Sequence, residues 1–196
     1  MLRKIVNVVV IGLMFSGVYA QTSAADKQLC YQSNISYPQV KVGNAVVAKF
    51  VSSFQALLIQ VLVDSGDDAT ACSQANNITI TYQKFTAMDD VISILFQSQM
   101  NYQHLAHPIT TFMALNYDLI KERQLTFSDV FTDTRDALTI LSRYSQQVLS
   151  KTLQGDAPSQ QMQEMATQML AQGSAPTVEN YKHWNLLKES IVITFD

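Results

Sequence analysis

Charged residues, glycine, proline and cysteine are all scarce in this sequence of 196 residues. Charged side chains form 15% of the chain and the formal net charge is −3, so there is no basic field for nucleic acid and no polybasic patch for a membrane. The six glycines and four prolines form no phosphate-binding loop, internal repeat or low-complexity segment. The hydrophobic fraction of 47% is ordinary for a globular protein, and the length suffices for one domain or two small ones.

The nucleophile motifs of hydrolases are also absent. The chain contains neither a Gly-x-Ser-x-Gly elbow nor a Ser-x-x-Lys sequence. Glycoside chemistry needs two carboxylates at a fixed separation, and Asp89, Asp90, Asp118 and Asp129 are candidates for such a pair. Their contexts instead favour a turn for the first two and turn or helix caps for the others. We therefore predict a protein that is not an enzyme and that uses no cofactor.

The first 20 residues have the three parts of a secretion signal. Basic residues at Arg3 and Lys4 precede an apolar run from Ile5 to Val18, and Val18 and Ala20 provide small residues before a cleavage point. The run is shorter than the roughly 20 residues of a membrane-spanning helix, so we expect no stable membrane span. The alternative is an uncleaved N-terminal anchor. The pattern predicts a periplasmic or secreted protein.

Two cysteines, Cys30 and Cys72, follow the predicted signal. In an oxidising compartment an even pair is most simply a disulfide. If a helix returns the chain between them, the strands that follow the two cysteines are parallel and begin at the same end of one sheet, which brings the sulfurs together. Two buried free thiols remain the alternative. A catalytic cysteine is disfavoured because neither residue has a neighbouring histidine to lower its pKa.

The stretch from Ile92 to Phe131 organises the predicted fold. It reads as two adjacent strands, each with alternate residues on one face, separated by His107 and Pro108, where proline breaks the ladder. A polar stop then starts a short helical turn. The faces of the strands comprise Ile92, Ile94, Phe96, Ser98, Met100 and Tyr102 on the first, and Met113, Leu115, Tyr117 and Leu119 on the second.

Helical spacing precedes and follows this stretch. Residues 42–63 form an apolar stripe with Asn44 as the expected N-cap, and residues 77–85 alternate as a half-buried strand. Helices follow from 134 and from 159 to 172, and strands cover 184–187 and 191–195. The second helix carries a methionine-rich stripe at Met162, Met165, Met169 and Leu170. Such a stripe is either a plastic binding surface or, as we expect, a face packed on a neighbouring helix.

The histidines offer a weak metal motif. His104 and His107 are three residues apart, which on a strand places them on opposite faces. No third ligand follows at a spacing typical of zinc. We therefore predict no metal site and a turn whose imidazoles bond to backbone carbonyls. Tyr102, His104 and His107 remain candidates for a binding surface.

The order of these elements resembles a known family. The residues that carry the resemblance are Ile35–Pro38, His107–Pro108, Asn116–Leu119, Leu125–Phe131 and the hairpin Trp184–Phe195. The sequence is similar to the extracytoplasmic domain of the anti-sigma factor RsiV, which is also appended to PdaC-like peptidoglycan deacetylases as a non-catalytic region. The resemblance implies an α+β fold with helices packed on an antiparallel, partly mixed β-sheet. It implies lysozyme or another envelope protein as partner.

The expected organisation is a signal at 1–20, an N-terminal α+β half at 26–108 and a C-terminal RsiV-like half at 109–196. Such domains normally continue with a further strand, and Ser190 stands where the inter-strand turn usually has glycine.

The favoured function is a periplasmic or secreted binding module that works through an exposed sheet edge or loop. One alternative is an accessory or weakly catalytic component of cell-wall (peptidoglycan) hydrolysis. A purely structural accessory subunit is the third hypothesis.

Overall fold

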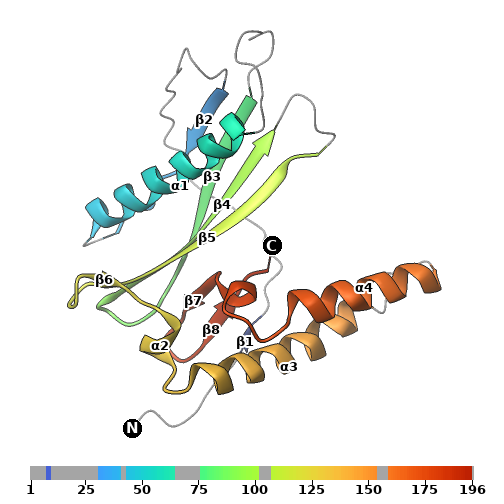
Figure 1. Ribbon diagram of the computed structural model, residues 1–196. Helices are drawn as coiled ribbons and strands as arrows, with labels where there is room; N and C mark the ends of the chain where they lie inside the picture. Colours follow the sequence, from blue (N-terminus) through green and yellow to red (C-terminus); the bar gives the residue numbers. More distant parts are fainter. Residues whose placement is uncertain are drawn as a thin grey trace.

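A five-stranded mixed sheet forms the upper layer of the molecule (Figure 1). The computed structural model describes residues 8–9, 31–40, 43–64, 76–101, 107–153 and 159–195. The strand order is β2 (Tyr31–Ile35), β3 (Asn76–Phe85), β4 (Val91–Asn101), β5 (Ile109–Asp118) and β6 (Arg123–Gln124). Strands β2 and β3 are parallel, and the remaining pairs are antiparallel. The predicted α+β class with a partly mixed sheet is confirmed.

Helix α1 (Asn44–Asp64) covers one face of this sheet and forms the first core. Its residues Val47, Val51, Phe54 and Leu58 are buried, at the three- and four-residue spacing of one helix face. They pack with buried strand residues Ile35, Ile78, Ile80, Ile92, Ile94, Phe96, Met100 and Leu115. Among the described helices, α1 is also long and apolar enough to meet the criteria for a membrane span, which the core helix of a soluble protein meets too.

The start of α1 differs from the predicted cap. The N–H of Val47 donates to the Gly43 carbonyl at 3.1 Å, while the Asn44 side chain accepts from the N–H of Val40 at 3.2 Å. The Asn44 side chain therefore bonds to Val40, four residues before the helix begins, rather than to an amide in the first turn. The chain bend at Gly43, whose φ is +87°, turns Val40 back toward this side chain.

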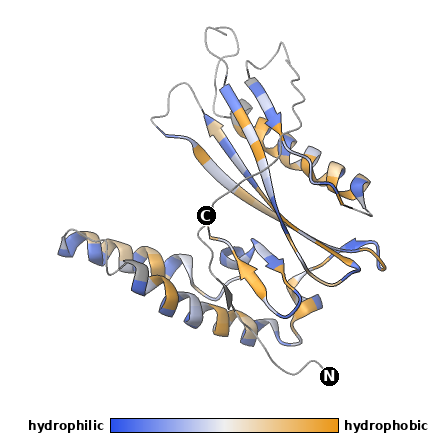
Figure 2. Cartoon of the chain, turned by 180° about the vertical axis from the view of Figure 1, so that it is seen from behind, coloured by the Kyte–Doolittle hydropathy of each residue, from blue (hydrophilic) through white to orange (hydrophobic). Residues whose placement is uncertain are grey.

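A second, smaller layer lies below the sheet (Figure 1). It contains β7 (Trp184–Leu186) and β8 (Ile191–Ile193), together with α2 (Phe127–Val130), α3 (Thr134–Leu153), α4 (Gln160–Gly173) and the 3-10 helix η1 (Glu179–Tyr181). The second core consists of buried residues from these elements: Leu125, Phe127, Leu138, Leu141, Tyr181, Trp184, Leu186, Ile191 and Ile193. In Figure 2, hydrophobic residues are prominent in the small sheet, whereas α3 and α4 mix hydrophobic and hydrophilic residues along their length.

Strand β1 (Val8–Val9) completes the small sheet, in the order β1-β8-β7. Val8 pairs with Ile191 and Val9 with Val192 in parallel. Both valines fall in the segment 1–20 that the sequence predicts to be a cleaved signal. Cleavage after residue 20 would remove β1 and leave β8 as an outer strand.

The methionine stripe of α4 does not pack on its neighbour. Met162, Met165 and Met169 are 52%, 61% and 64% exposed, and the half-buried residues of the helix are Ala166 and Leu170. The expectation that the stripe is a packing face is therefore wrong for the three methionines, whereas Leu170, the fourth residue of the predicted stripe, is half-buried. Alanine and leucine, four residues apart, form the inner row instead.

Candidate functional site

The outer edge of β5 is the first part of the candidate site. Tyr117 and Asp118 pair with β6, and the Asn116 carbonyl accepts from the N–H of Leu125 at 2.8 Å. Because the backbone of a strand alternates, Thr110, Phe112 and Ala114 point their N–H and C=O groups the same way as Asn116, away from β4. Over these three residues, which we call the β5 edge, no described strand pairs with β5.

A buried histidine lies beside the β5 edge. The rings of Phe112 and His183 meet edge to face, with centroids 6.5 Å apart. His183 is 8% exposed, and its carbonyl accepts from the N–H of Thr194 at 2.8 Å. This bond fixes the segment between η1 and β7 against the C-terminal end of β8. The histidine is thereby held next to the strand edge.

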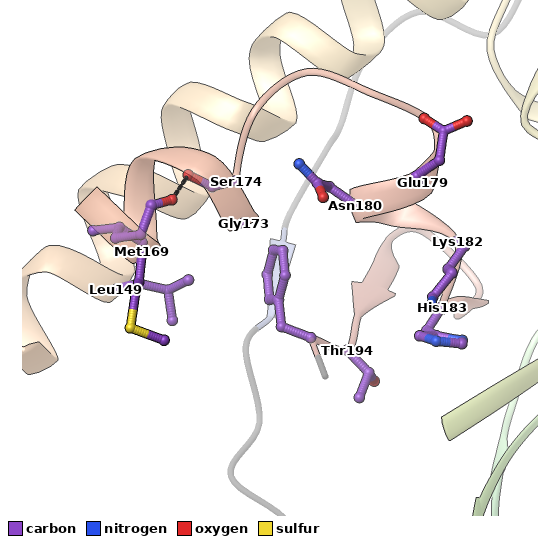
Figure 3. Close-up of a pocket in the computed structure, with 11 residues that line it drawn as sticks. Leu149, Met169, Gly173, Ser174, Glu179, Asn180, Lys182, His183 and Thr194 are labelled. Carbon is purple, nitrogen blue, oxygen red and sulfur yellow. Dashed lines mark hydrogen bonds between the residues drawn. The ribbon is translucent and has the colours of Figure 1, made fainter. Parts of the chain in front are cut away.

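A cavity of about 400 Å³ opens on the other side of His183. Figure 3 shows one wall formed by Glu179, Asn180, Lys182 and His183, and the opposite wall formed by Leu149 and Met169. The remaining lining residues are Leu170, Gly173, Ser174, Thr194 and Phe195. The cavity thus combines an apolar wall with a wall that carries both charges, and it adjoins the β5 edge through the contact between His183 and Phe112.

Local hydrogen bonds hold the polar wall in place. The Asn180 amide donates to the carbonyls of Gln172 and Ala175 at 2.8 and 3.1 Å. The Tyr181 hydroxyl donates to the Ser174 carbonyl at 2.9 Å, and burial raises the pKa of this hydroxyl. The short helix η1 is therefore attached to the C-terminal end of α4, so the two walls keep a fixed separation.

The carboxylates considered for glycoside chemistry have structural partners. Asp129 binds the Arg123 guanidinium at 2.9 and 2.5 Å and accepts from the N–H and hydroxyl of Thr126 at 2.8 Å each. The Arg123 guanidinium, followed by Thr126, holds the pKa of Asp129 well below its usual range. Asp118 accepts from the N–H groups of Ile120 and Lys121. These bonds, the one from Lys121 most of all, lower the pKa of Asp118.

Asp89 and Asp90 form the turn between β3 and β4. The interpretation of all four aspartates as turn and cap residues is confirmed. Asp118 and Asp129 belong to the polar turn and capped helix that follow β5, and their oxygens bond to backbone N–H groups and to the side chains of Lys121, Arg123 and Thr126.

Of the residues predicted for a binding surface, the structure describes one. His107 is exposed immediately before Pro108 and β5, so it extends the β5 edge at its N-terminal end. Tyr102 and His104 lie outside the described residues. Across the part of the chain that the structure describes, no group of three or more histidine, cysteine, aspartate or glutamate side chains is placed to hold a metal ion.

The predicted disulfide partners, Cys30 and Cys72, also lie outside the described residues. The strands that follow them behave as expected. Tyr31 pairs with Asn76 in parallel register, so β2 and β3 begin at the same end of the sheet with α1 returning the chain between them. The layout on which the disulfide prediction depends is confirmed, and the disulfide itself stays a prediction.

The cavity residues of 173–183 were missed by the sequence analysis. That stretch carries no strand or helix periodicity, and its one buried aromatic, Tyr181, has no partner at a regular spacing. The nearest signal is Asn180, since asparagine side chains commonly bond to nearby backbone carbonyls in non-helical segments. The cavity arises from tertiary contact between η1, α4 and the segment after β8.

No protein-family model matches the sequence, and no curated protein matches it. Two solved structures of DUF3298 family proteins are similar to it. One, from Bacteroides fragilis, has a TM-score of 0.42 and 17% identity, and the match covers 78% of this chain and 72% of that one. The other, from Pseudomonas aeruginosa, has a TM-score of 0.42 and 15% identity, with 73% and 72% covered.

Proposed function

We propose that this protein is an exported, non-catalytic binding module of the cell envelope. It takes up an extended segment of a partner protein along the β5 edge. The observation that carries the proposal is the row of outward N–H and C=O groups at Thr110, Phe112 and Ala114, which no described strand pairs. An extended peptide added to such an edge gains a ladder of main-chain hydrogen bonds.

The cavity supplies a source of specificity in this proposal. Alternate side chains of an added strand point to the same face of the sheet as Phe112, toward His183 and the adjoining cavity of about 400 Å³. Its Leu149 wall accepts apolar atoms, and Glu179 and Lys182 opposite offer charges of both signs. Main-chain bonds then provide affinity, and the cavity selects the side chain.

Lysozyme is the first partner to test, because the sequence resembles the extracytoplasmic domain of RsiV-type proteins. Another envelope protein is the alternative partner. The binding function is favoured over a cell-wall hydrolase because, of the four candidates for a carboxylate pair, Asp118 and Asp129 accept hydrogen bonds from backbone N–H groups and Asp89 and Asp90 lie in a turn. The resemblance to PdaC-like proteins concerns their non-catalytic region and is consistent with this choice.

The test is a binding measurement with immobilised mature protein, against lysozyme and against peptidoglycan fragments. The informative variant is Ala114→Pro, which removes an outward N–H while leaving the bonds to β4 intact. Its matched control is Ala114→Ser, which keeps that N–H. We expect the wild type and the serine variant to retain lysozyme, and the proline variant to release it with an unchanged circular dichroism spectrum.

Two results contradict the proposal. One is the absence of retention of either ligand by the wild type at micromolar concentration. The other is equal binding by the folded proline variant, which would place the contact away from the β5 edge. Hydrolysis of the peptidoglycan fragments by the wild type would instead support the alternative function.

A further inference from the structure

The exposed methionines of α4 form a row of sulfur donors on one side of the helix. With 3.6 residues per turn, positions 162, 165 and 169 fall within an arc of about 60°. Residues three or four apart on a helix have Cβ atoms about 5–6 Å from each other. Each methionine is more than half exposed. The three side chains therefore leave α4 from neighbouring turns on one face, and Met169 also lines the cavity described above.

On α4 itself, no hard, charged ligand lies beside the methionine row, although Met169 at its C-terminal end also lines the cavity that contains Glu179 and Lys182. Glu164 is the one charged residue in α4, its position is more than a quarter turn from the methionine row, and it accepts from the Gln160 amide at 3.2 Å. Carboxylate and carbonyl oxygens suit magnesium and calcium, whereas thioethers select soft ions such as Cu(I). A row of thioethers without a carboxylate on the same face of the helix is thus chemically selective.

We propose that Met162, Met165 and Met169 bind a soft monovalent metal ion, Cu(I), through their three sulfur atoms. Methionine is unbranched and has three rotatable bonds, so the outer two side chains can lean along the helix toward Met165. The site includes no residue of the β5 edge and shares only Met169 with the adjoining cavity. The proposal follows from the donor chemistry of three exposed side chains and not from their apolar area. A purely apolar docking face is the competing explanation.

Silver(I) is the probe, because it has the same soft chemistry and does not change oxidation state in air. The full chain is labelled with ¹³C in the methionine methyl groups and titrated with Ag⁺. Single Met→Leu variants assign the signals. We expect the signals of Met162, Met165 and Met169 to shift together and to saturate. Met88, which is 58% exposed in the segment between β3 and β4, is an isolated thioether and serves as internal control.

A parallel calorimetric titration separates the site from other silver ligands, including the cysteine thiols. The triple variant Met162→Leu, Met165→Leu, Met169→Leu keeps the helix propensity and the apolar area of α4 and should lose the saturable component. Met88→Leu should retain it. The proposal is overturned if the Met88 signal moves in step with the three others, if none of the three moves, or if the triple variant binds Ag⁺ as the wild type does.

Discussion

The side-chain amide of Asn116 in β5 donates to the carbonyl oxygen of Trp184 in β7, at a distance of 2.6 Å. The side-chain oxygen of Asn116, Oδ1, accepts from the Ser93 hydroxyl at 2.8 Å. That hydroxyl in turn accepts from the N–H of Leu186 at 2.9 Å. Asn116 and Ser93 are 3% and 2% exposed. A small buried network thus connects the five-stranded sheet to the small sheet and fixes where β7 crosses it.

Replacing Asn116 with alanine should destabilise the fold by about 2–3 kcal/mol, because the Trp184 carbonyl and the Ser93 hydroxyl lose a buried partner. Urea unfolding followed by tryptophan fluorescence measures the change, since Trp184 is the only tryptophan. Thr110→Ala, an exposed position on the same strand, is the control and should change stability little. Equal effects of the two substitutions would contradict the role assigned to the network.

Asp129 should make stability depend on acid pH. Its pKa is lowered in the folded state, first by the Arg123 guanidinium and then by Thr126. A carboxyl group with a lowered folded pKa contributes stability above its unfolded pKa of about 3.9, and that contribution disappears as the pH falls through the folded value. The stabilising effect is therefore complete near neutral pH and fades below about pH 4.

Urea midpoints of the wild type and Asp129→Asn, measured from neutral pH downward, test this dependence. The variant should be the less stable protein at neutral pH, and the difference should narrow below about pH 4. A stability difference that stays constant over the whole pH range would show that Asp129→Asn destabilises the protein for a reason other than the lost charge.

Cys30 and Cys72 should be joined in native protein, because the strands that follow them start side by side at Tyr31 and Asn76. Peptide mapping without reduction is expected to give one linked pair. Cys30→Ser, Cys72→Ser and the double variant should each lose about the same stability, at most about 4 kcal/mol for a loop of this length. Alkylation of both thiols in unreduced protein would refute the prediction.

How much of the fold can be predicted from the sequence depends on how far apart in the chain the interacting residues lie. Strand β4 and helix α1 were predicted because their residues alternate or recur at helical spacing over many positions. The burial of both faces of β4 was not predicted. Ser93 is 2% exposed and its hydroxyl accepts from Asn185 and Leu186 of β7, a strand about ninety residues further along the chain. Asn185 is also fully buried, which its place in the predicted strand 184–187 did not indicate.

The candidate site shows the same division. The β5 strand and its start at His107 and Pro108 were predicted, since local residue preferences determine them. The neighbouring cavity was not, because His183 reaches Phe112 only after the chain has passed through α3, α4 and η1. Exposure of the α4 methionines was also unpredictable, since a periodic row of apolar side chains reads the same whether it faces a partner helix or solvent.

Gly43 and Gly173 provide a matched pair for the last prediction. Gly43 has a φ of +87°, and an added Cβ would lie 2.6 Å from Ile92 Cδ1 and 3.2 Å from Leu119 Cδ2. Gly43→Ala should therefore destabilise the protein by about 1–3 kcal/mol through strain and displacement of Ile92. An added Cβ at Gly173, the last residue of α4, has no atom within 4 Å, so Gly173→Ala should be neutral or stabilising by up to about 1 kcal/mol. Thermal unfolding of both variants tests the contrast, and a Gly43 variant as stable as the wild type would show that α1 can start without the left-handed residue.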